Sequence, residues 1–568
     1  MMRPVGLSPR HFAIPFAFLV VVLGLSPSAA LAEEGDDADN PVDQAESAIT
    51  YEADAEYRVR SVRIDPIELS GTRVRDINFT EQRARIDAST ALDGVGAIYF
   101  QMDALEGVLF GDNGRFLGDP SANSGVSLAA TTPNLTRRDI GLLPGGDPFN
   151  REDYGPVLRQ ADLFRVNYLY ADAMLPFGLL RVGRQPLNYG ATITAHEGGR
   201  FNRWGVSEHA DAADRILFGT KLDEAIRVIT SGGDHTPNPS MDEGLVWALF
   251  YDFHQQDNIA LMSDNLRQMG TNLQWLLPEA SWLGQDWRDL RVSATFTHLR
   301  NEYFDSRIYA FPFAMGGSIN NVDLDFQFSH IRGETREVSE GFAALTGSTA
   351  VSQRFDAYGA RGVADIHFGP VMLTLEANYA SGDANPRPDQ PLTAFTFARD
   401  LNVGLLMFEH ILAFESARSA AVGIENLRDL EMESFPLTEV QTDGRFTNAI
   451  GLFPQLYVSL LDRGDHLLHT RLGVLTAWSA TELGAVDAIQ TALNDDGGPI
   501  EDNIINYHGG IPARFYGTEV DLQLGYQFRE NFFWTVEGAV LFPGPALHDE
   551  HGDAVRSFLV ENRFEFLF

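Results

Sequence analysis

The chain has 568 residues, no cysteine, a single lysine (Lys221) and a formal net charge of −37 at pH 7. The lack of cysteine excludes thiol catalysis and thiolate metal sites. The acidity argues against nucleic acid as a partner, because phosphate binding needs a basic surface. Cation binding and plain solubility both account for the acidity, and solubility is the simpler interpretation.

The N-terminus predicts a cleaved secretory signal peptide over residues 1–32. Basic residues precede an almost unbroken apolar run over 12–25, which is too short to cross a bilayer comfortably as a mature helix. Ala30-Leu31-Ala32 then supplies the small-x-small pattern of a cleavage site. An uncleaved anchor helix is the alternative. Residues 33–50 are acidic and lack apolar periodicity, so we expect a disordered periplasmic leader there.

After the leader, the hydropathy pattern changes to period two, which predicts β-strands. The residues of 322–329 alternate between an apolar set and a polar set: Val322, Leu324, Phe326 and Phe328 against Asp323, Asp325, Gln327 and Ser329. Residues 291–297 and 519–529 alternate in the same way. Alternation of this kind places the two sets on opposite faces of a sheet. No run of about 18 apolar residues follows the signal, so no transmembrane helix is expected.

Three features together favour a transmembrane barrel over a large soluble β protein. The candidate strands are about ten residues long, their apolar faces are rich in aromatic residues, and short turns alternate with long connections. Short turns are expected at 92–94, 176–178, 222–224, 369–370, 463–465 and 529–531, and long connections at 106–161, 188–212, 382–446 and 480–514. The fold class is therefore an all-β, antiparallel outer-membrane β-barrel of 16–18 strands over residues 51–568, with long external loops and short periplasmic turns.

The individual strands are predicted from the same pattern. They lie near 55–65, 78–90, 95–105, 162–174, 179–187, 213–222, 225–233, 245–254, 288–300, 302–311, 319–331, 355–368, 370–381, 447–461, 466–478, 516–528, 531–541 and 555–568. Two segments do not follow the pattern. Residues 255–287 have no clear pattern, and a helical insert over 264–276 is one interpretation of them. Residues 402–414 are apolar on nearly all sides, and they form either a helix that folds into the barrel mouth or an element packed only among external loops.

The C-terminus is the sharpest local signal. Phe564, Phe566 and Phe568 share one parity, and Glu565 lies between them on the other. A last strand that ends in phenylalanine resembles the recognition signal of the outer-membrane assembly machinery. We therefore expect the assembly machinery as a partner, contacted through Phe568. Outer-membrane lipid is the other expected partner.

Charged residues on the polar parity are candidates for lining a pore. Arginine costs about 2–4 kcal/mol on a lipid face at the membrane midplane, so these side chains are expected to face inward. The candidates are Arg83, Arg85, Asp87, Arg165, Arg181 and Gln185 on early strands, and Asp323, Asp325, Glu376, Glu519, Asp521 and Glu537 on later ones. Arginines that face carboxylates across a pore would create a transverse field. The alternative is that they pair with one another and stiffen the wall.

No motif indicates an enzyme, a cofactor or a metal. A hydrolase elbow, a phosphate loop and paired histidines on a helix are all absent from the sequence, so no enzymatic activity is expected. Possible metal ligands in and just after the second long connection are His196, Glu197, His209, Asp211 and Asp214. Their spacing matches no metal motif, and a solvated loop is favoured.

Four short motifs occur in the order seen in alginate-export-type porins. Residues 180–190 (LRVGRQPLNYG) resemble that family's GRQ…YG strand end, and 515–522 (FYGTEVDL) are similar to its G-T-E-hydrophobic-D strand. Phe542-Pro543-Gly544 and Ala380-Ser381-Gly382-Asp383 also resemble family segments. The resemblance implies a monomeric 18-stranded barrel with an arginine-lined constriction that passes anionic polymers or small anions. The residues carried over are Arg181, Arg184, Gln185, Glu519 and Asp521.

These observations together predict a Gram-negative outer-membrane channel for small or anionic hydrophilic solutes. The chain departs from the family in its net acidity, its single lysine and its apolar segment 403–414, which speak for a divergent member. A closed structural or receptor barrel that displays acidic external loops is the alternative function.

Overall fold

The computed structural model describes most of the chain after the leader. The described residues are 49–70, 76–111, 162–187, 191–196, 202–207, 211–232, 234–238, 243–253, 266–282, 284–399, 401–416, 419–420, 442 and 444–568. All of them belong to one compact unit, Ala48–Phe568. The predicted signal peptide lies outside the described residues, as does the leader up to residue 48.

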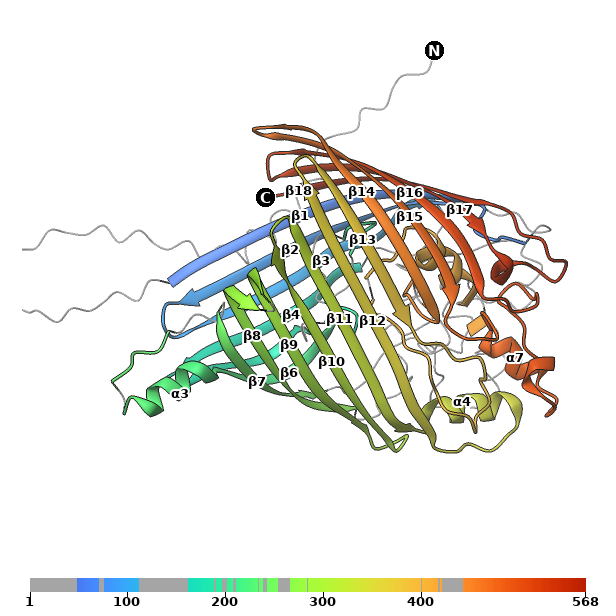
Figure 1. Cartoon of the computed structure of the whole chain (residues 1–568), viewed down its shortest axis with the longest axis horizontal. Coiled ribbons are helices and arrows are strands. Elements are labelled where there is room, and N and C mark those ends of the chain that lie inside the picture. Colours follow the sequence, from blue (N-terminus) through green and yellow to red (C-terminus); the bar gives the residue numbers. More distant parts are fainter. Residues whose placement is uncertain are drawn as a thin grey trace, which may run out of the picture. The chain divides into compact units, whose positions relative to one another are not determined.

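Eighteen strands form one antiparallel sheet that closes on itself, because β1 pairs with both β18 and β2 (Figure 1). The first nine are β1 (Ile49–Asp65), β2 (Ile77–Leu92), β3 (Gly96–Gly111), β4 (Asp162–Leu175), β5 (Gly178–Pro186), β6 (Ala212–Lys221), β7 (Gly244–Phe253), β8 (Arg267–Trp282) and β9 (Gln285–Asn301). The others are β10 (Ser306–Ile319), β11 (Val322–Thr335), β12 (Gln353–Phe368), β13 (Val371–Ala380), β14 (Ala449–Arg463), β15 (His466–Ser479), β16 (Phe515–Phe528), β17 (Phe532–Pro543) and β18 (Ser557–Leu567). The predicted barrel is confirmed, and its strand number is 18.

Two of the expected elements are wrong, and the two errors cancel in the strand count. Residues 225–233 were expected as a strand after a turn at 222–224. Leu222–Thr230 instead form helix α3, since their apolar residues recur at helical spacing. Conversely, 267–276 do not form a helical insert but the first part of β8, which pairs with β7 and β9.

The connections differ at the two ends of the sheet. At the end where the chain leaves β18, which we call the short-turn end, most strands are joined by two or three residues, and the α3 connection is the long exception. The other, long-connection end carries the longer segments with α4 (Glu337–Thr346), α7 (Ala488–Asn494) and the short helices η5 (Ile500–Asp502) and η6 (Pro545–Leu547). No helix in the described part of the chain is both long and apolar enough to cross a membrane.

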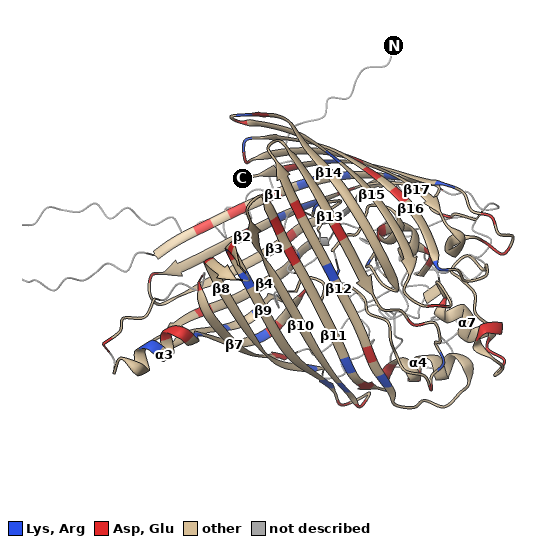
Figure 2. Cartoon of the chain, in the orientation of Figure 1, with Lys and Arg blue, Asp and Glu red and all other residues tan. Residues whose placement is uncertain are grey.

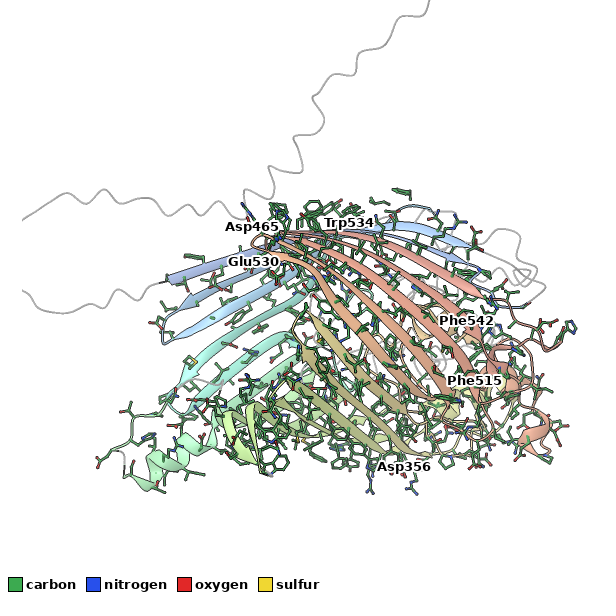
Figure 3. The ribbon with its side chains drawn as sticks, turned by 45° about the horizontal axis from the view of Figure 1, so that its top comes forward. Asp356, Asp465, Phe515, Glu530, Trp534 and Phe542 are labelled. Carbon is green, nitrogen blue, oxygen red and sulfur yellow. The ribbon has the colours of Figure 1, made fainter. Side chains whose placement is uncertain are left out.

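The outer face of the sheet is apolar and carries an aromatic band near each end. On β18, Phe558 and Val560 are 49% and 57% exposed, whereas Leu559 between them is buried. Toward the short-turn end, Trp534 stacks on Phe564 with ring centroids 6.4 Å apart. Figure 3 shows Trp534 there beside the turn residues Asp465 and Glu530, with Phe515 and Phe542 farther along the strands.

The long-connection end has its own band on β9–β12. His298 stacks on Tyr309 with ring centroids 4.7 Å apart, and His330 stacks on Tyr358 at 4.3 Å. These side chains are on the outward parity of their strands, level with one another in the strand register. Two aromatic bands that flank an apolar wall are the pattern of a sheet that crosses a membrane.

Part of the connection between β13 and β14 (381–448), among its described residues, packs against the inner wall. Its segment 401–416 contains the π-helical turn η3 (Met407–Leu412), and its side chains Leu406, Phe408 and Phe414 are fully buried. They share one apolar cluster with Phe453 and Leu475, which face inward from β14 and β15. The apolar segment singled out in the sequence thus contains a helical turn, Met407–Leu412, that packs against the inner wall. That it narrows the barrel mouth stays a prediction.

Candidate functional site

The inner wall of β1–β3 carries buried ion pairs. On β2, the Arg83 Nη2 atom lies 2.7 Å from Glu56 Oε1, and both side chains are 2% exposed. Arg85 donates two hydrogen bonds to Asp103 on β3, at 2.7 and 2.9 Å. Each charge thus has an opposite charge at hydrogen-bond distance, which is what a charge needs when it is removed from water.

A second buried cluster continues the belt onto β17 and β18. Arg60 binds Glu561 at 2.9 Å and Glu81 at 3.2 Å. Arg563 binds Glu561 at 3.0 Å and Glu537 at 3.2 Å. Because Glu561 lies between the two arginines, the cluster joins β1, β2, β17 and β18 where the sheet closes.

The same side chains hold a segment of the long connection between β5 and β6. Glu537 accepts a hydrogen bond from the Gly205 N–H at 3.1 Å, and Arg563 donates to the Gly205 carbonyl at 2.9 Å. Arg83 donates to the Ser207 carbonyl at 3.4 Å. The segment 202–207 is therefore bound to inward-facing side chains through its own peptide groups.

Glu519 does the same for the β13–β14 connection. Its carboxylate accepts three backbone hydrogen bonds, from Leu405 and Met407 at 2.6 Å and from Leu406 at 2.9 Å. Gly404 precedes them with φ +80°, and a Cβ there would meet Glu519 Oε1 at 2.8 Å, so this position needs glycine. The carboxylate thus satisfies N–H groups at the start of the helical turn, where a negative charge is favoured.

The opposite part of the inner wall, on β8–β12, faces open space. A cavity of about 1050 Å³ lies there, and its lining includes Arg203, Arg291, Arg361, Asp325, Asp365 and Gln274. Arg203 binds Asp365 through two hydrogen bonds of 3.1 and 2.8 Å. Arg361 binds Glu376 at 3.1 Å.

Arg291 differs from the other arginines of the cavity. It is exposed, and it forms no ion pair with any residue that the structure describes. It lies directly opposite Gly316 in the strand register, and Gly316 lies opposite Asp325 on its other side. A positive and a negative side chain thus flank a glycine on the cavity wall, and both signs of charge are presented to whatever enters.

Most of the predicted pore-lining residues lie on the inner face, but few reach the cavity. Eight of them are buried or are paired with a neighbouring side chain: Arg83, Arg85, Arg181 (with Asp172), Gln185, Glu376, Glu519, Asp521 and Glu537. Asp87 accepts a hydrogen bond from Gln101, and Arg165 lies opposite Asp103 in the strand register. Asp323 and Asp325 line the cavity. Whether any of these residues contacts a solute stays a prediction.

Arg184 lies outside this set. The structure corrects its expected inward placement, because it has the parity opposite to Arg181. It is on the outer face, where it donates two 2.9 Å hydrogen bonds to Asp214, and both side chains are about half exposed (52% and 50%). Its neighbour Gln185 is buried and donates to the Arg215 carbonyl at 3.2 Å.

The loop that offered possible metal ligands has a structural pairing instead. The N–H of His196 donates to Asp211 at 2.9 Å, and the N–H of Asp211 donates back to the His196 carbonyl at 2.8 Å. Glu197 and His209 lie outside the described residues. Among the described ones, no group of three histidine, aspartate or glutamate side chains is placed to hold a metal ion.

Some of the cavity residues are marked by a pattern in the sequence. Arg291 belongs to the polar set of a strand whose alternation is visible, so its inward direction was predictable. Arg361 and Asp365 also share one parity on β12. Arg203 lies in an irregular connection, and no periodicity marks it.

Comparison with known proteins gives structural similarity only. No family model matches the chain, and no curated protein matches its sequence. Among solved structures, it is similar to Pseudomonas aeruginosa OccK2 (OpdF), with 10% identity, a TM-score of 0.43 and coverage of 91% of this chain and 97% of that one. It is also similar to Acinetobacter baumannii OccAB4 (8%, 0.43, 91% and 98%) and to a BenF-like porin from Pseudomonas fluorescens (9%, 0.42, 91% and 98%). At these values the similarity decides nothing about solutes or residues.

Proposed function

We propose that this protein is an outer-membrane channel of a Gram-negative bacterium that lets small hydrophilic solutes pass. The observation that carries the proposal is the charged cavity of about 1050 Å³ on the inner side of a closed sheet whose outer face is apolar. A wall of this kind suits lipid outside and a polar solute inside. Passage through it needs no covalent chemistry.

The cavity dimensions and charges favour a small solute. Its volume is at the upper end of the range of ordinary small-molecule sites, about 300–1,000 Å³. Arg291 supplies a positive charge without an ion partner among the described residues, and Asp325 supplies a negative one nearby. The resemblance to alginate-export-type porins adds anionic solutes as the expected class, and this finer assignment is part of the proposal.

Recording from planar bilayers tests the proposal. The purified protein should give discrete conductance steps, and Gln274→Trp, which puts a larger side chain on the cavity wall, should reduce them. Leu273→Trp is the matched control, because Leu273 is the neighbouring residue on β8 and faces outward, 41% exposed. If the protein shows no conductance under any salt or voltage, the channel proposal fails.

A closed receptor-like barrel is the second candidate function. The apolar cluster formed by 401–416 with the inner wall favours it, because such a cluster fills part of the lumen. A protein that never conducts but binds a partner through its acidic loops would have this function.

The part of Phe568 in assembly also stays a proposal, tested by the insertion yield of a Phe568→Ala variant.

A further inference from the structure

Three arginines lie side by side on the outer face at the long-connection end. In the strand register, Arg267 on β8 is directly opposite Arg300 on β9, and Arg300 is directly opposite Arg307 on β10. All three are exposed. We call them the arginine row. Neighbouring strands are about 4.8 Å apart, so the row spans about 10 Å.

Among the described residues, the positive charges of the row are met only by exposed carboxylates. Arg267 forms no ion pair within the described residues. Arg300 lies 3.4 Å from Glu302 and Arg307 lies 3.3 Å from Asp305, and all four of these side chains are more than half exposed. Pairs as exposed as these contribute little, whereas like charges directly opposite each other in a sheet are destabilising.

The next strands extend the row with mixed charge. Glu334 on β11 lies opposite Arg307, and Arg354 on β12 lies opposite Glu334. One step farther from the loops, Arg332 is exposed and lies opposite Asp356, which Arg354 also binds. Figure 2 shows this interleaving of blue and red at the lower ends of β11 and β12, and Figure 3 labels Asp356 there. Arginines that lie directly opposite one another on the outer face at this end are therefore confined to β8–β10.

The arginine row lies immediately beyond the aromatic band. His298 and Tyr309 are two residues from Arg300 and Arg307 on the same outward parity, and they stack on each other. Phe296 and Phe311 follow another two residues toward the middle of the wall, with ring centroids 5.4 Å apart. Aromatic bands of membrane proteins lie at the boundary between hydrocarbon and headgroups. Side chains one step beyond the band are at headgroup level.

We propose that the arginine row is a binding site for the phosphate groups of a phosphorylated lipid in the leaflet at the long-connection end. Guanidinium groups match phosphate oxygens with paired hydrogen bonds, so one phosphate between two neighbouring arginines neutralises both. Glu302 and Asp305 compete with a headgroup for Arg300 and Arg307. The site therefore binds only headgroups whose phosphate charge exceeds the attraction of these two carboxylates. The proposal rests on the membrane placement in the proposed function, but not on conductance.

Binding of lipid to the full-length protein in a neutral detergent tests the proposal. The probes are diphosphoryl lipid A, its fully dephosphorylated form and inorganic phosphate, and the readout is the population of lipid-bound protein in native mass spectrometry across a titration. We expect diphosphoryl lipid A to bind and the dephosphorylated form to bind at least tenfold more weakly. Replacing the row by glutamine (Arg267→Gln, Arg300→Gln, Arg307→Gln) should weaken binding of diphosphoryl lipid A at least tenfold.

A matched triple variant controls for loss of positive charge in general. Arg288, Arg463 and Arg529 are exposed arginines at the short-turn end, and their change to glutamine should alter binding less than twofold. Heat-dependent gel mobility reports whether each variant is folded, and Arg267→Gln alone serves if the triple variant is not. Equal binding by the row variant and the control would overturn the proposal. Competition by millimolar inorganic phosphate would show a free-phosphate site instead, and it would overturn the lipid assignment.

The assay also separates this proposal from the proposed function. If the protein binds the lipid through the row but shows no conductance, the lipid site stands and the channel proposal fails. If the protein conducts while both triple variants bind lipid equally, the channel proposal stands and the lipid site fails.

Discussion

The two parts of the inner wall contain similar residues in different surroundings. On β1, β2 and β16–β18, arginines and carboxylates are buried, bound to one another and bound to the peptide groups of the segments inside the sheet. On β8–β12, residues of the same types and parity face a cavity, and Arg291 is exposed. An inward-facing charged side chain thus holds inner segments in place in one part of the wall and faces the cavity in the other. Its role depends on whether an inner segment covers that part of the wall.

The largest effect is expected where a single carboxylate holds an inner segment. Glu519→Ala removes the acceptor of three buried N–H groups, and each unsatisfied donor costs about 1–3 kcal/mol. We expect a loss of several kcal/mol in urea unfolding in detergent, together with larger conductance steps as 401–416 loosens. Unchanged stability would show that Glu519 does not hold the segment.

Asp521 provides the matched control, and its replacement is expected to change stability in the opposite direction. It is two residues from Glu519 on the same inner face and is equally buried, but its carboxylate oxygens accept no hydrogen bond from an N–H or O–H group of the described residues. A buried carboxylate without donors is costly, so Asp521→Asn should leave stability unchanged or raise it.

Arginines from the two parts of the wall should separate stability from selectivity. Arg83→Gln removes the arginine that lies 2.7 Å from buried Glu56. Breaking a buried pair costs up to about 3–5 kcal/mol, and the change should not move the reversal potential in a salt gradient. Arg291→Gln should cost less than about 0.5 kcal/mol and shift the reversal potential toward cations, because it removes a positive charge from the cavity. If Arg83→Gln changed selectivity as much as Arg291→Gln, the distinction between the two parts would be lost.

More of the architecture than of the candidate site could be predicted from the sequence. Alternation predicts which residues face inward, and the length of the connections predicts which end they lie on, because both follow from local geometry. Apolar residues at helical spacing occur in both misassigned segments. In 222–230 this spacing does mark a helix, and the prediction of a strand there overlooked it, whereas in 267–276 it favours a helix that does not form. Leu266, Met269, Leu273 and Leu276 have that spacing, yet pairing with β7 and β9 makes this segment a strand.

The site could not be predicted to the same extent, because burial depends on segments distant in the chain. Nothing in the alternation of 519–529 indicates that Leu405, Leu406 and Met407 would reach Glu519 across more than a hundred residues. Arg203 could not be predicted for the same reason, because its partner Asp365 is on a strand far along the chain. Parity gives direction, and only the packed fold shows whether water, protein or solute fills the space.

A pH effect of intermediate size is expected from His410 in the inner segment. Burial, aided by the positive charge of Arg60, lowers its pKa from 6.5 to about 3. The unfolded chain therefore takes up a proton below pH 6.5 that the folded protein does not, and stability falls as the pH drops from 6.5 toward 3. The slope is about 1.4 kcal/mol per pH unit, or about 2 kcal/mol between pH 6.5 and 5.

Urea unfolding at pH 7 and pH 5 measures this effect. Burial raises the pKa of Asp383, in the same connection, to about 6, and its contribution has the opposite sign: it is present below pH 3.8 and is lost as the pH rises through 6. The difference between the parent protein and His410→Gln isolates the histidine, and His551→Gln, with a 63% exposed side chain, is the control. An equal acid response of all three proteins would exclude His410 as its source.

The smallest effect is expected at Arg184, although its motif carried the family resemblance. Its two hydrogen bonds to Asp214 are both 2.9 Å long, but both side chains are half exposed on the outer face, and exposed pairs of this kind contribute about 0–1 kcal/mol. Arg184→Gln should therefore lower unfolding stability by less than about 1 kcal/mol and leave the reversal potential unchanged. Arg181→Gln, three residues earlier on the inward parity and paired with Asp172, is the comparison. A selectivity change in Arg184→Gln larger than in Arg181→Gln would mean that solutes approach along a path on which Arg184 lies, and the assignment of inner and outer faces on β5 would have to be reversed.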